Sequence, residues 1–434
     1  MNPKIVWFPV ILLLLALSAC SRTAGKASPS PFNSKSTKLA TLPPGYEIGD
    51  IFFSPNGHGV AVFAGREGQS VVSLNGRLGK SYAAVLTPVF RQGADDFAHV
   101  AVEGSKQRVL VNGDEGKAYD SVGKPVFASN GRIIHEARVG EKWVIVRNGG
   151  ESSQFSSENP GIVVASDGAR FAYVEQTPDH KKSFVRVCSS DMGTCFKGKE
   201  YDWISAIETD RSGTRLFYTV RNGASKALVT TDPRQKDFSE EESPWYIDIL
   251  FAGISDGGGH VAYFAQRKGR TVLIRDGHEV APAPDQNIFN IAVSRTGRTV
   301  YSALIDGKVA AWVDGIRQRE AYDEINEPSF SPDGIHFVYA VTRGEKSFIV
   351  VDGTEGPQYD KVVGPKFSPD GSRLVYRARR DGQRFVVIAD LKGATLRELP
   401  QYEAVWDTSF SPDGKLVGYG VRQGNDLWWM VEKL

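Results

Sequence analysis

The sequence is poor in cysteine and has no surplus of charge of either sign. It holds three Cys in 434 residues, which excludes a disulfide-dense framework. Lys and Arg number 52 against 51 Asp and Glu, and this balance argues against nucleic acid as a partner. After residue 20 the chain has neither helical periodicity nor an apolar run long enough to cross a bilayer.

Glycine, in contrast, is abundant, at 45 residues, and it does not follow the spacing of collagen. Combined with many aromatic and β-branched residues, this excess predicts short strands joined by tight turns. The hydrophobic fraction of 41% is too high for a disordered chain. Length alone suggests two or three domains.

Residues 1–19 are predicted to be a signal peptide. Lys4 precedes the apolar run Ile5–Ala19, whose 15 residues are too few to cross the bilayer, because the hydrocarbon core is ~30 Å thick. A basic start, a short apolar stretch and small residues before a break are typical of secretion signals. Leu17-Ser18-Ala19-Cys20 then resembles a bacterial lipobox, which implies that Cys20 carries a lipid.

The resemblance also implies a location. Ser21, in place of Asp, follows Cys20, as in lipoproteins of the outer-membrane sorting class. We therefore expect a lipid-anchored protein of the outer membrane that faces the periplasm, with the cell surface as the alternative. Residues 20–37, rich in Ser, Thr, Lys and Pro, are predicted to be a flexible tether to a folded region of residues 38–434.

The folded region consists of one repeat. Phe-Ser-Pro-Asp-Gly recurs at Phe330, Phe367 and Phe410, with Phe-Ser-Pro-Asn-Gly at Phe53, and degenerate copies keep the turn. Ten turn positions follow, at residues 57, 94, 131, 168, 213, 258, 297, 334, 371 and 414. Five of the intervals are 37 residues long, which indicates an internal repeat rather than chance similarity.

Each copy is predicted to form four short strands. An apolar segment enters the turn, and a strand with Tyr five residues after the glycine follows, as in Tyr339, Tyr376 and Tyr419. The third strand ends in Asn-Gly or Asp-Gly, which favours a hairpin, as at Asn75 and Asp352. A fourth strand carries Tyr-Asp and leads to the next copy.

The Phe-Ser-Pro-Asp-Gly turn with its Tyr-bearing strand resembles the TolB-type β-propeller repeat, which is related to the WD-repeat class. This resemblance implies an all-β propeller of about ten four-stranded blades. The last copy shows a third strand at Leu427–Val431, and residues 38–42 match the fourth strand of another copy, so we expect an N-terminal strand to close a single ring. Two smaller propellers in tandem are the alternative.

Catalytic and metal-binding motifs are weak. Gly253-Ile254-Ser255-Asp256-Gly257 fits the nucleophile-elbow pattern, but Ser255 is in register with the serine of the blade turns. The seven His show no metal-binding spacing. We therefore expect no enzyme activity and no cofactor.

Cys188 and Cys195 flank a predicted hairpin and are expected to form a disulfide in an oxidising compartment.

Two longer repeats contain insertions, one with the cysteine hairpin and one at Thr231–Pro244. Both are expected to be surface loops, and a partner contact there is the alternative. The loops that lead from fourth to first strands are expected to ring one mouth of the central channel. They would place the following residues at a ligand or partner site, with blade packing as the alternative for the tryptophans: Asp50, Lys124, Trp203, Asn326, Glu327, Trp406 and Asp407.

These observations favour a monomeric, lipid-anchored binding scaffold that holds a protein partner in the cell envelope. Two alternatives place a site at the channel mouth: a carbohydrate or small-ligand binding module, and a propeller-based enzyme such as a lyase or a quinoprotein. The membrane contact would be made through the lipid on Cys20.

Overall fold

The computed structural model describes residues 35–434, except for residues 92, 129, 158–160, 166, 167, 192, 211, 236, 237, 285 and 286. In this part of the chain all regular structure is β-strand, and no helix suitable for spanning a bilayer is found. The predicted signal peptide, Cys20 and most of the predicted tether lie outside the described residues.

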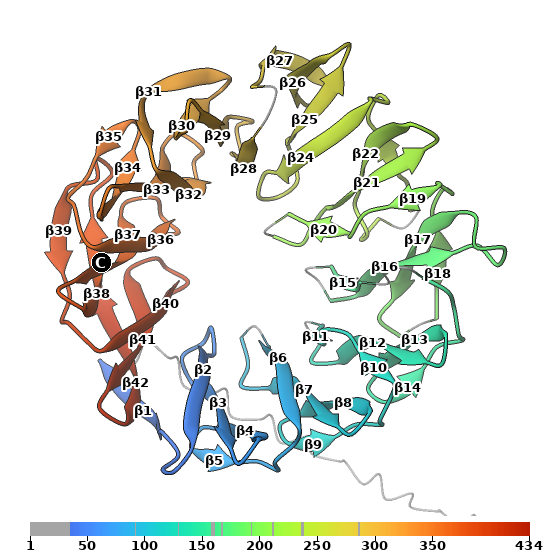
Figure 1. Ribbon diagram of the computed structural model, residues 1–434, viewed down its shortest axis with the longest axis horizontal. Coiled ribbons are helices and arrows are strands. Elements are labelled where there is room, and N and C mark those ends of the chain that lie inside the picture. Colours follow the sequence, from blue (N-terminus) through green and yellow to red (C-terminus); the bar gives the residue numbers. More distant parts are fainter. Residues whose placement is uncertain are drawn as a thin grey trace, which may run out of the picture.

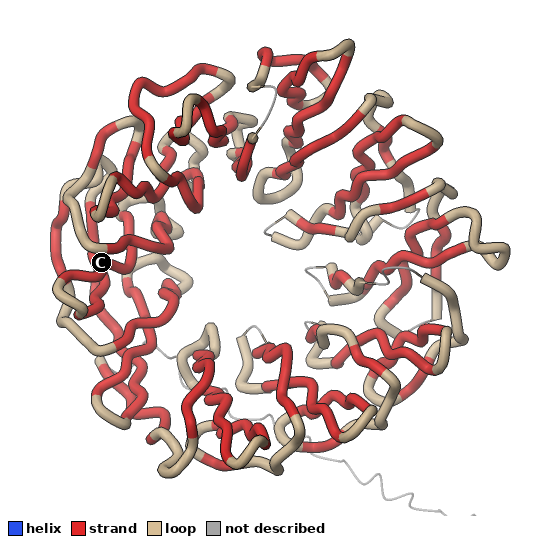
Figure 2. The backbone as a smooth tube through the Cα atoms, in the orientation of Figure 1, coloured by secondary structure: helices blue, strands red, loops and turns tan. Residues whose placement is uncertain are grey.

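Ten antiparallel sheets are arranged in a ring, and the first strand of each lies nearest the axis (Figure 1). Figure 2 shows strands and connecting loops alternating around the whole ring. Eight sheets have four strands, and in the other two a fifth arises because the first strand is in two pieces. The protein is therefore a ten-bladed β-propeller in a single ring, as the repeat predicted, and not two propellers in tandem.

The blades are numbered here in chain order, beginning with the blade whose first strand is β2. The first strands are β2 (Glu47–Phe53), β6 (Ala84–Phe90), β10 (Ser121–Val122) with β11 (Val126–Phe127), β15 (Val163–Val164), β19 (Trp203–Ile204) with β20 (Glu208–Thr209), β24 (Asp248–Ile254), β28 (Ile288–Val293), β32 (Glu324–Phe330), β36 (Lys361–Phe367) and β40 (Ala404–Phe410). The second strands are β3 (Val60–Arg66), β7 (Phe97–Glu103), β12 (Ile133–Val139), β16 (Arg170–Gln176), β21 (Leu216–Asn222), β25 (Val261–Arg267), β29 (Thr299–Ile305), β33 (Phe337–Arg343), β37 (Leu374–Arg380) and β41 (Leu416–Gln423).

The outer half of each blade follows the same order. The third strands are β4 (Gln69–Leu74), β8 (Lys106–Val111), β13 (Lys142–Arg147), β17 (Ser183–Ser189), β22 (Ser225–Thr231), β26 (Arg270–Arg275), β30 (Lys308–Val313), β34 (Lys346–Val351), β38 (Gln383–Ala389) and β42 (Asp426–Lys433). The outermost strands are β5 (Arg77–Leu78), β9 (Asp114–Glu115), β14 (Gly150–Glu151), β18 (Cys195–Lys197), β23 (Glu241–Glu242), β27 (His278–Pro282), β31 (Ile316–Tyr322), β35 (Thr354–Glu355), β39 (Thr395–Glu398) and, in blade 10, β1 (Ser36–Thr41).

Blade 10 closes the ring with strands from both ends of the described chain. β1 pairs antiparallel with β42, from Ser36 opposite Met430 to Thr41 opposite Asp426. Lys38 Nζ lies 2.8 Å from Asp426 Oδ2. The closing strand predicted at residues 38–42 is thus formed by residues 36–41.

The two kinds of turn fix the strand ends through side chains. In the Ser-Pro-Asp-Gly turns, illustrated by blade 8, Ser331 Oγ accepts the His336 N–H at 2.9 Å and donates to Asp333 Oδ1 at 2.5 Å. In six blades the Asn or Asp at the end of the third strand accepts the N–H of the residue 15 positions earlier, at 2.8–3.0 Å. These six residues have φ between 43° and 53°, the left-handed region that Asn and Asp tolerate best after Gly.

The outer rim joins neighbouring blades through a repeated Tyr–Glu contact. The Tyr hydroxyl donates to a Glu of the next blade at 2.7–3.0 Å in five pairs: Tyr82–Glu115, Tyr119–Glu151, Tyr201–Glu242, Tyr322–Glu355 and Tyr359–Glu398. Each of these Glu also accepts from a Lys or Arg. Hydrogen bonds from Tyr82 and Lys80 lower the pKa of Glu115 to about 2. The packed blade faces are therefore supplemented by polar links at the rim.

Candidate functional site

The first strands carry an irregularity where they face the centre of the ring. In seven of them the pairing with the second strand shifts, as in β-bulges, and in two others the strand is interrupted near the same point. The residues at the shift are mostly exposed, including Asp50, Thr87, Phe251, Glu327 and Asp407. The inner wall of the ring is thus lined by bulge residues, which differ in type from blade to blade.

The predicted mouth residues belong to these first strands rather than to the connecting loops. Their positions are Asp50 in β2, Lys124 between β10 and β11, Trp203 at the start of β19, Asn326 and Glu327 in β32, and Trp406 and Asp407 in β40. The prediction placed them in loops because it began each first strand only at the apolar residues next to the turn. The strands begin earlier, so the bulge falls inside them.

The structure brings some of these residues together and separates others. Glu327 and Asp407 line one cavity of about 970 Å³ on the inner wall. Asn326 and Glu327 line a second cavity of about 620 Å³ with Phe251. Asp50, Lys124 and Trp203 stand on blades 1, 3 and 5 and line neither of these two cavities.

The two tryptophans make packing contacts. The ring of Trp406 lies 5.1 Å from the ring of Phe53, across the junction of blades 10 and 1. Trp203 is half-buried, with the Arg221 guanidinium 6.0 Å from its ring centre. Trp406 therefore contributes to ring closure.

In the larger cavity the predicted residue Asp407 lies beside two cations, Lys366 and Arg377, that the sequence prediction did not include. Asp407 Oδ2 lies 2.7 Å from Lys366 Nζ, and Asp407 Oδ1 lies 3.8 Å from Arg377 Nη2. Arg377 Nε is buried and has no hydrogen-bond partner among the described residues. Lys366 and Arg377 side chains are 27% and 26% exposed, against 65% for Asp407.

Strand pairing aligns the ten blades residue by residue and shows that this cluster is particular to blade 9. The residues aligned with Arg377 are Phe63, Val100, Glu136, Val174, Thr219, Phe264, Ser302, Ala340 and Gly420. Those aligned with Lys366 are Phe52, Val89, Val126, Val163, Glu208, Gly253, Ala292, Ser329 and Ser409. No other blade has a basic residue at either position. The sequence repeat contains this difference between the blades, but it can be recognised only when the pairing register of the strands is known.

A group of exposed apolar side chains, called the apolar patch below, consists of Ile247, Leu250, Phe251 and Phe289. Their exposed fractions are 61%, 36%, 45% and 39%. Ile247 precedes β24, Leu250 and Phe251 form its bulge, and Phe289 lies on the adjacent first strand β28. Side chains of this size are normally buried, so their exposure on neighbouring blades marks a surface suited to binding.

Cations lie next to the apolar patch. The Ile247 N–H donates to the Gln266 carbonyl at 3.1 Å, directly before the hairpin that contains Arg267 and Lys268. Both side chains are exposed, and neither forms an ion pair within the described part of the chain. The surface therefore combines apolar side chains with unpaired positive charge.

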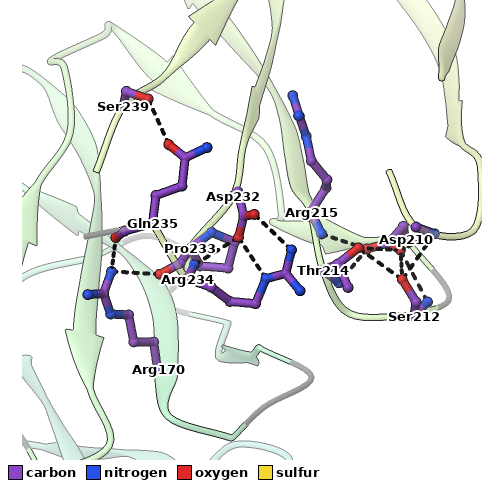
Figure 3. Close-up of polar contacts among 11 residues, drawn as sticks. Arg170, Asp210, Ser212, Thr214, Arg215, Asp232, Pro233, Arg234, Gln235 and Ser239 are labelled. Atoms are coloured by element: carbon purple, nitrogen blue, oxygen red, sulfur yellow. Dashed lines mark hydrogen bonds and ion pairs between the residues drawn. The ribbon is translucent and has the colours of Figure 1, made fainter. Parts of the chain in front are cut away.

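The insertion at residues 231–244 is built into blade 5. Arg170 Nη1 donates to the Pro233 carbonyl at 2.9 Å, and Asp232 pairs with Arg234 at 2.8 Å (Figure 3). Farther along, Glu240 accepts from Tyr218 and from the Lys199 N–H. Burial raises the pKa of Glu240. This insertion supplies β23, which links blades 4 and 5.

Asp210 occupies the position of the turn serine in blade 5. It is 2% exposed and accepts the N–H groups of Thr214 at 2.6 Å and Arg215 at 2.7 Å. It also accepts the Gly257 N–H of blade 6 at 3.1 Å. Although burial opposes ionisation, these hydrogen bonds lower the pKa of Asp210. Its role is to hold the turn and the blade junction.

The remaining motifs have structural surroundings. Ser255 is fully buried, and its Oγ accepts the His260 N–H at 2.9 Å inside the blade turn. Cys188 and Cys195 face each other in β17 and β18 and are joined by a disulfide, with S–S 2.01 Å. Within the described residues, no three His, Cys, Asp or Glu side chains are grouped to hold a metal ion.

Fold and inner wall together define a β-propeller of ten blades with a varied inner surface. No family model and no curated protein match the chain. Among solved structures, a eukaryotic initiation factor shares 11% identity over 86% of this chain and 92% of its own, with a TM-score of 0.48. The Dos1 propeller shares 10% over 91% and 93%, with a TM-score of 0.39. TolB from Acinetobacter baumannii shares 17% over 60% and 79%, with a TM-score of 0.29. At these identities the likeness concerns the fold alone.

Proposed function

We propose that this propeller is a non-catalytic binding scaffold that docks a partner protein on the apolar patch of blades 6 and 7. The observation that carries the proposal is the exposure of four apolar side chains on, or directly before, the adjacent first strands β24 and β28: Ile247, Leu250, Phe251 and Phe289. A rigid ring presents such a surface without the entropy cost of ordering a loop. Recognition surfaces with apolar anchors commonly bind complementary apolar side chains.

The charge beside the apolar patch determines the kind of partner. Arg267 and Lys268 have no acidic neighbour in an ion pair within the described residues, so acidic groups of a partner would complement them. The proposed occupant is an acidic segment of another protein that carries apolar side chains. Its binding is expected to weaken as salt concentration rises.

We further propose that the scaffold acts as a monomer in the cell envelope, anchored through a lipid on Cys20. The lipobox-like segment Leu17-Ser18-Ala19-Cys20 supports this location. The test compares membrane partitioning of wild type and Cys20→Ala after cell fractionation. The variant is expected in the soluble fraction, and equal partitioning would contradict the anchor.

The patch is tested with substitutions that the other blades already contain. Phe251 aligns with Asp50 and Asp407, and Phe289 aligns with Asn326, so Phe251→Asp with Phe289→Asn is compatible with the blade. A photo-crosslinking residue at position 251 should capture one defined envelope protein. The same residue at position 316, which is 70% exposed on β31, should not capture it.

Three outcomes decide the proposal. Loss of binding to the purified partner in the double variant, and weaker binding in Arg267→Glu with Lys268→Glu, would support it. Equal capture by wild type and the patch variant would overturn it. Patch-dependent binding to anionic lipid vesicles without protein would also overturn it, because the occupant would then be a lipid surface.

A further inference from the structure

We propose that Lys366 and Arg377 form a binding site for the anionic group of a small ligand, a carboxylate or a phosphate, on the inner wall of the ring. The site lies in the cavity of about 970 Å³ that residues of blades 5 to 10 line, most of them from blades 7, 8 and 9. This volume is large enough for a ligand of several heavy atoms.

The ten aligned blades serve as internal controls for this inference. A blade can fold without a cation at the positions of Lys366 and Arg377, because the nine blades other than blade 9 have no basic residue there. Blade 8, for example, has Ala340 and Ser329 where blade 9 has Arg377 and Lys366. Placing two cations in a partly buried wall has a desolvation cost that the fold does not require. A ligand with negative charge gives these residues a role.

The cluster also has unused binding capacity. Lys366 donates to Asp407 at 2.7 Å and to the Thr408 carbonyl at 3.1 Å. The contact of Asp407 with Arg377, at 3.8 Å, is too long for a hydrogen bond. Arg377 Nε is buried without an acceptor among the described residues. The guanidinium can therefore offer a forked pair of donors to a planar carboxylate or to phosphate oxygens.

The cavity contains acidic as well as basic side chains, which are Asp256, Glu327, Asp407, Arg295, Lys366 and Arg377. Glu327 of blade 8, which lines the cavity, accepts the Gly364 N–H at 2.5 Å. Gly364 has φ +65°, and a Cβ there would lie 3.4 Å from Arg377 Nη2. The glycine bulge thus leaves room beside the guanidinium.

Asp407 acts in this proposal as an internal competitor. Its side chain is 65% exposed, so it can rotate away from Lys366 when a ligand anion takes its place. The cost of breaking this ion pair would lower the affinity of the ligand. Neutralising Asp407 is therefore expected to tighten binding, whereas removing either cation is expected to weaken it.

The test measures binding of inorganic phosphate and of succinate by isothermal titration calorimetry. Arg377→Ala and Lys366→Ser introduce the residues that blade 8 already has, so folding should be kept, and circular dichroism checks this. Each is expected to weaken binding about tenfold or more. Asp407→Asn is expected to tighten it severalfold. Lys346→Ser, which removes the rim pair with Asp360, is the matched control and should leave binding unchanged.

The outcomes separate this site from the docking surface. The proposal is overturned if wild type binds neither probe at millimolar concentration, or if Arg377→Ala and Lys346→Ser behave alike. Binding of phosphate but not succinate assigns the phosphate class, and the reverse assigns the carboxylate class. Because Lys366 and Arg377 are not part of the apolar patch, partner capture and anion binding can fail independently.

Discussion

At the scale of single residues, two buried histidines replace a repeated tyrosine. The position directly before that of Arg377 in the aligned second strands is Tyr in seven blades, as in Tyr339 of blade 8. Blades 2 and 3 have His99 and His135 there. Each is 5% exposed. Burial lowers the pKa of both imidazoles from 6.5 to about 4. The native protein thus binds a proton at these sites more weakly than the unfolded chain does.

This difference predicts acid sensitivity. Because the folded pKa is depressed, the stabilising contribution is complete above pH 6.5 and declines as pH falls toward 4. The loss is expected to reach about 3 kcal/mol for each histidine. At pH 8, the double variant His99→Tyr with His135→Tyr should unfold at a urea concentration similar to that of wild type. At pH 4.5, it should unfold at a higher urea concentration than wild type.

The two proteins are compared at each pH, so acid effects of carboxylates common to both cancel. Parallel loss of stability in both proteins would show that these histidines do not cause the sensitivity. The cavity of about 620 Å³ beside His99 provides space for the larger ring.

The sequence located most of the repeated tyrosines but not their full register. Tyr301 follows Gly297 by four residues rather than five, because this turn is shorter: Ser294 N–H bonds to Arg298 O, whereas Ser331 N–H bonds to His336 O. Because the turn of blade 3 is shortened in the same way, the sequence spacing does not align His135 with the repeated tyrosines. Only the pairing of the strands aligns these residues, and it also reveals Arg377 as the exception at its position.

At the scale of the elements, the Asn and Asp residues before glycine have a dual role. Asn75 has φ 51° and accepts the Val60 N–H at 2.8 Å, which connects the hairpin to the second strand. Asn75→Ala is expected to destabilise the protein by about 1–2 kcal/mol, because it loses this bond and strains the backbone. Urea unfolding measures the change.

Asn75→Asp is the matched control, because Asp fills the position in blades 6 to 8 and makes the same contact. It is expected to retain nearly the stability of wild type. Equal destabilisation by both changes would mean that the side-chain acceptor does not hold the strand end.

The hairpin of blade 4 has a covalent link in place of this contact. Cys188 and Cys195 close a loop with a separation of 7 residues. In the chain-entropy account, a loop of this size contributes about 2 kcal/mol. Cys188→Ala with Cys195→Ala should lower the midpoint of thermal unfolding. Reductant should lower that of wild type but not that of the variant; an unchanged midpoint in both would contradict a stabilising role.

The strand pattern was predictable at this scale, but the bulges were not. Alternating apolar residues and Asn-Gly or Asp-Gly turns mark strand ends because both depend on local backbone preferences. A bulge depends on pairing with the neighbouring strand, so Glu327 and Asp407 were expected in loops. The group at the inner wall was therefore only partly predictable.

At the scale of the whole molecule, the ring depends on β1. Ten repeats and the match of residues 38–42 to a fourth strand were enough to predict a single closed ring, because the repeat fixes the number of blades. Three-dimensional proximity across the inner wall was not available from the sequence. Contacts such as that of Lys366 with Asp407 join residues of different blades.

Removing residues 35–41 is expected to lower the thermal unfolding midpoint and to cause self-association, because the edge of β42 would lose its partner. Calorimetry and size-exclusion chromatography measure both effects. Lys38→Ala removes only an exposed ion pair, and we expect a loss below about 1 kcal/mol. A truncated chain that stays monomeric and equally stable would refute a closing role for β1.

The pairing of β1 with β42 also bears on where the chain can be cut. The Val431 N–H donates to the Lys35 carbonyl at 2.9 Å, so the two ends of the described chain lie side by side in one blade. A peptide linker between them and new termini in another hairpin, such as the one at Gly344, would give a circular permutant. All strands of blade 10 would then come from one uninterrupted stretch of chain, and the two termini would lie in blade 8. Because the ring is closed, the same blade order around it can be formed by chains that begin in different blades.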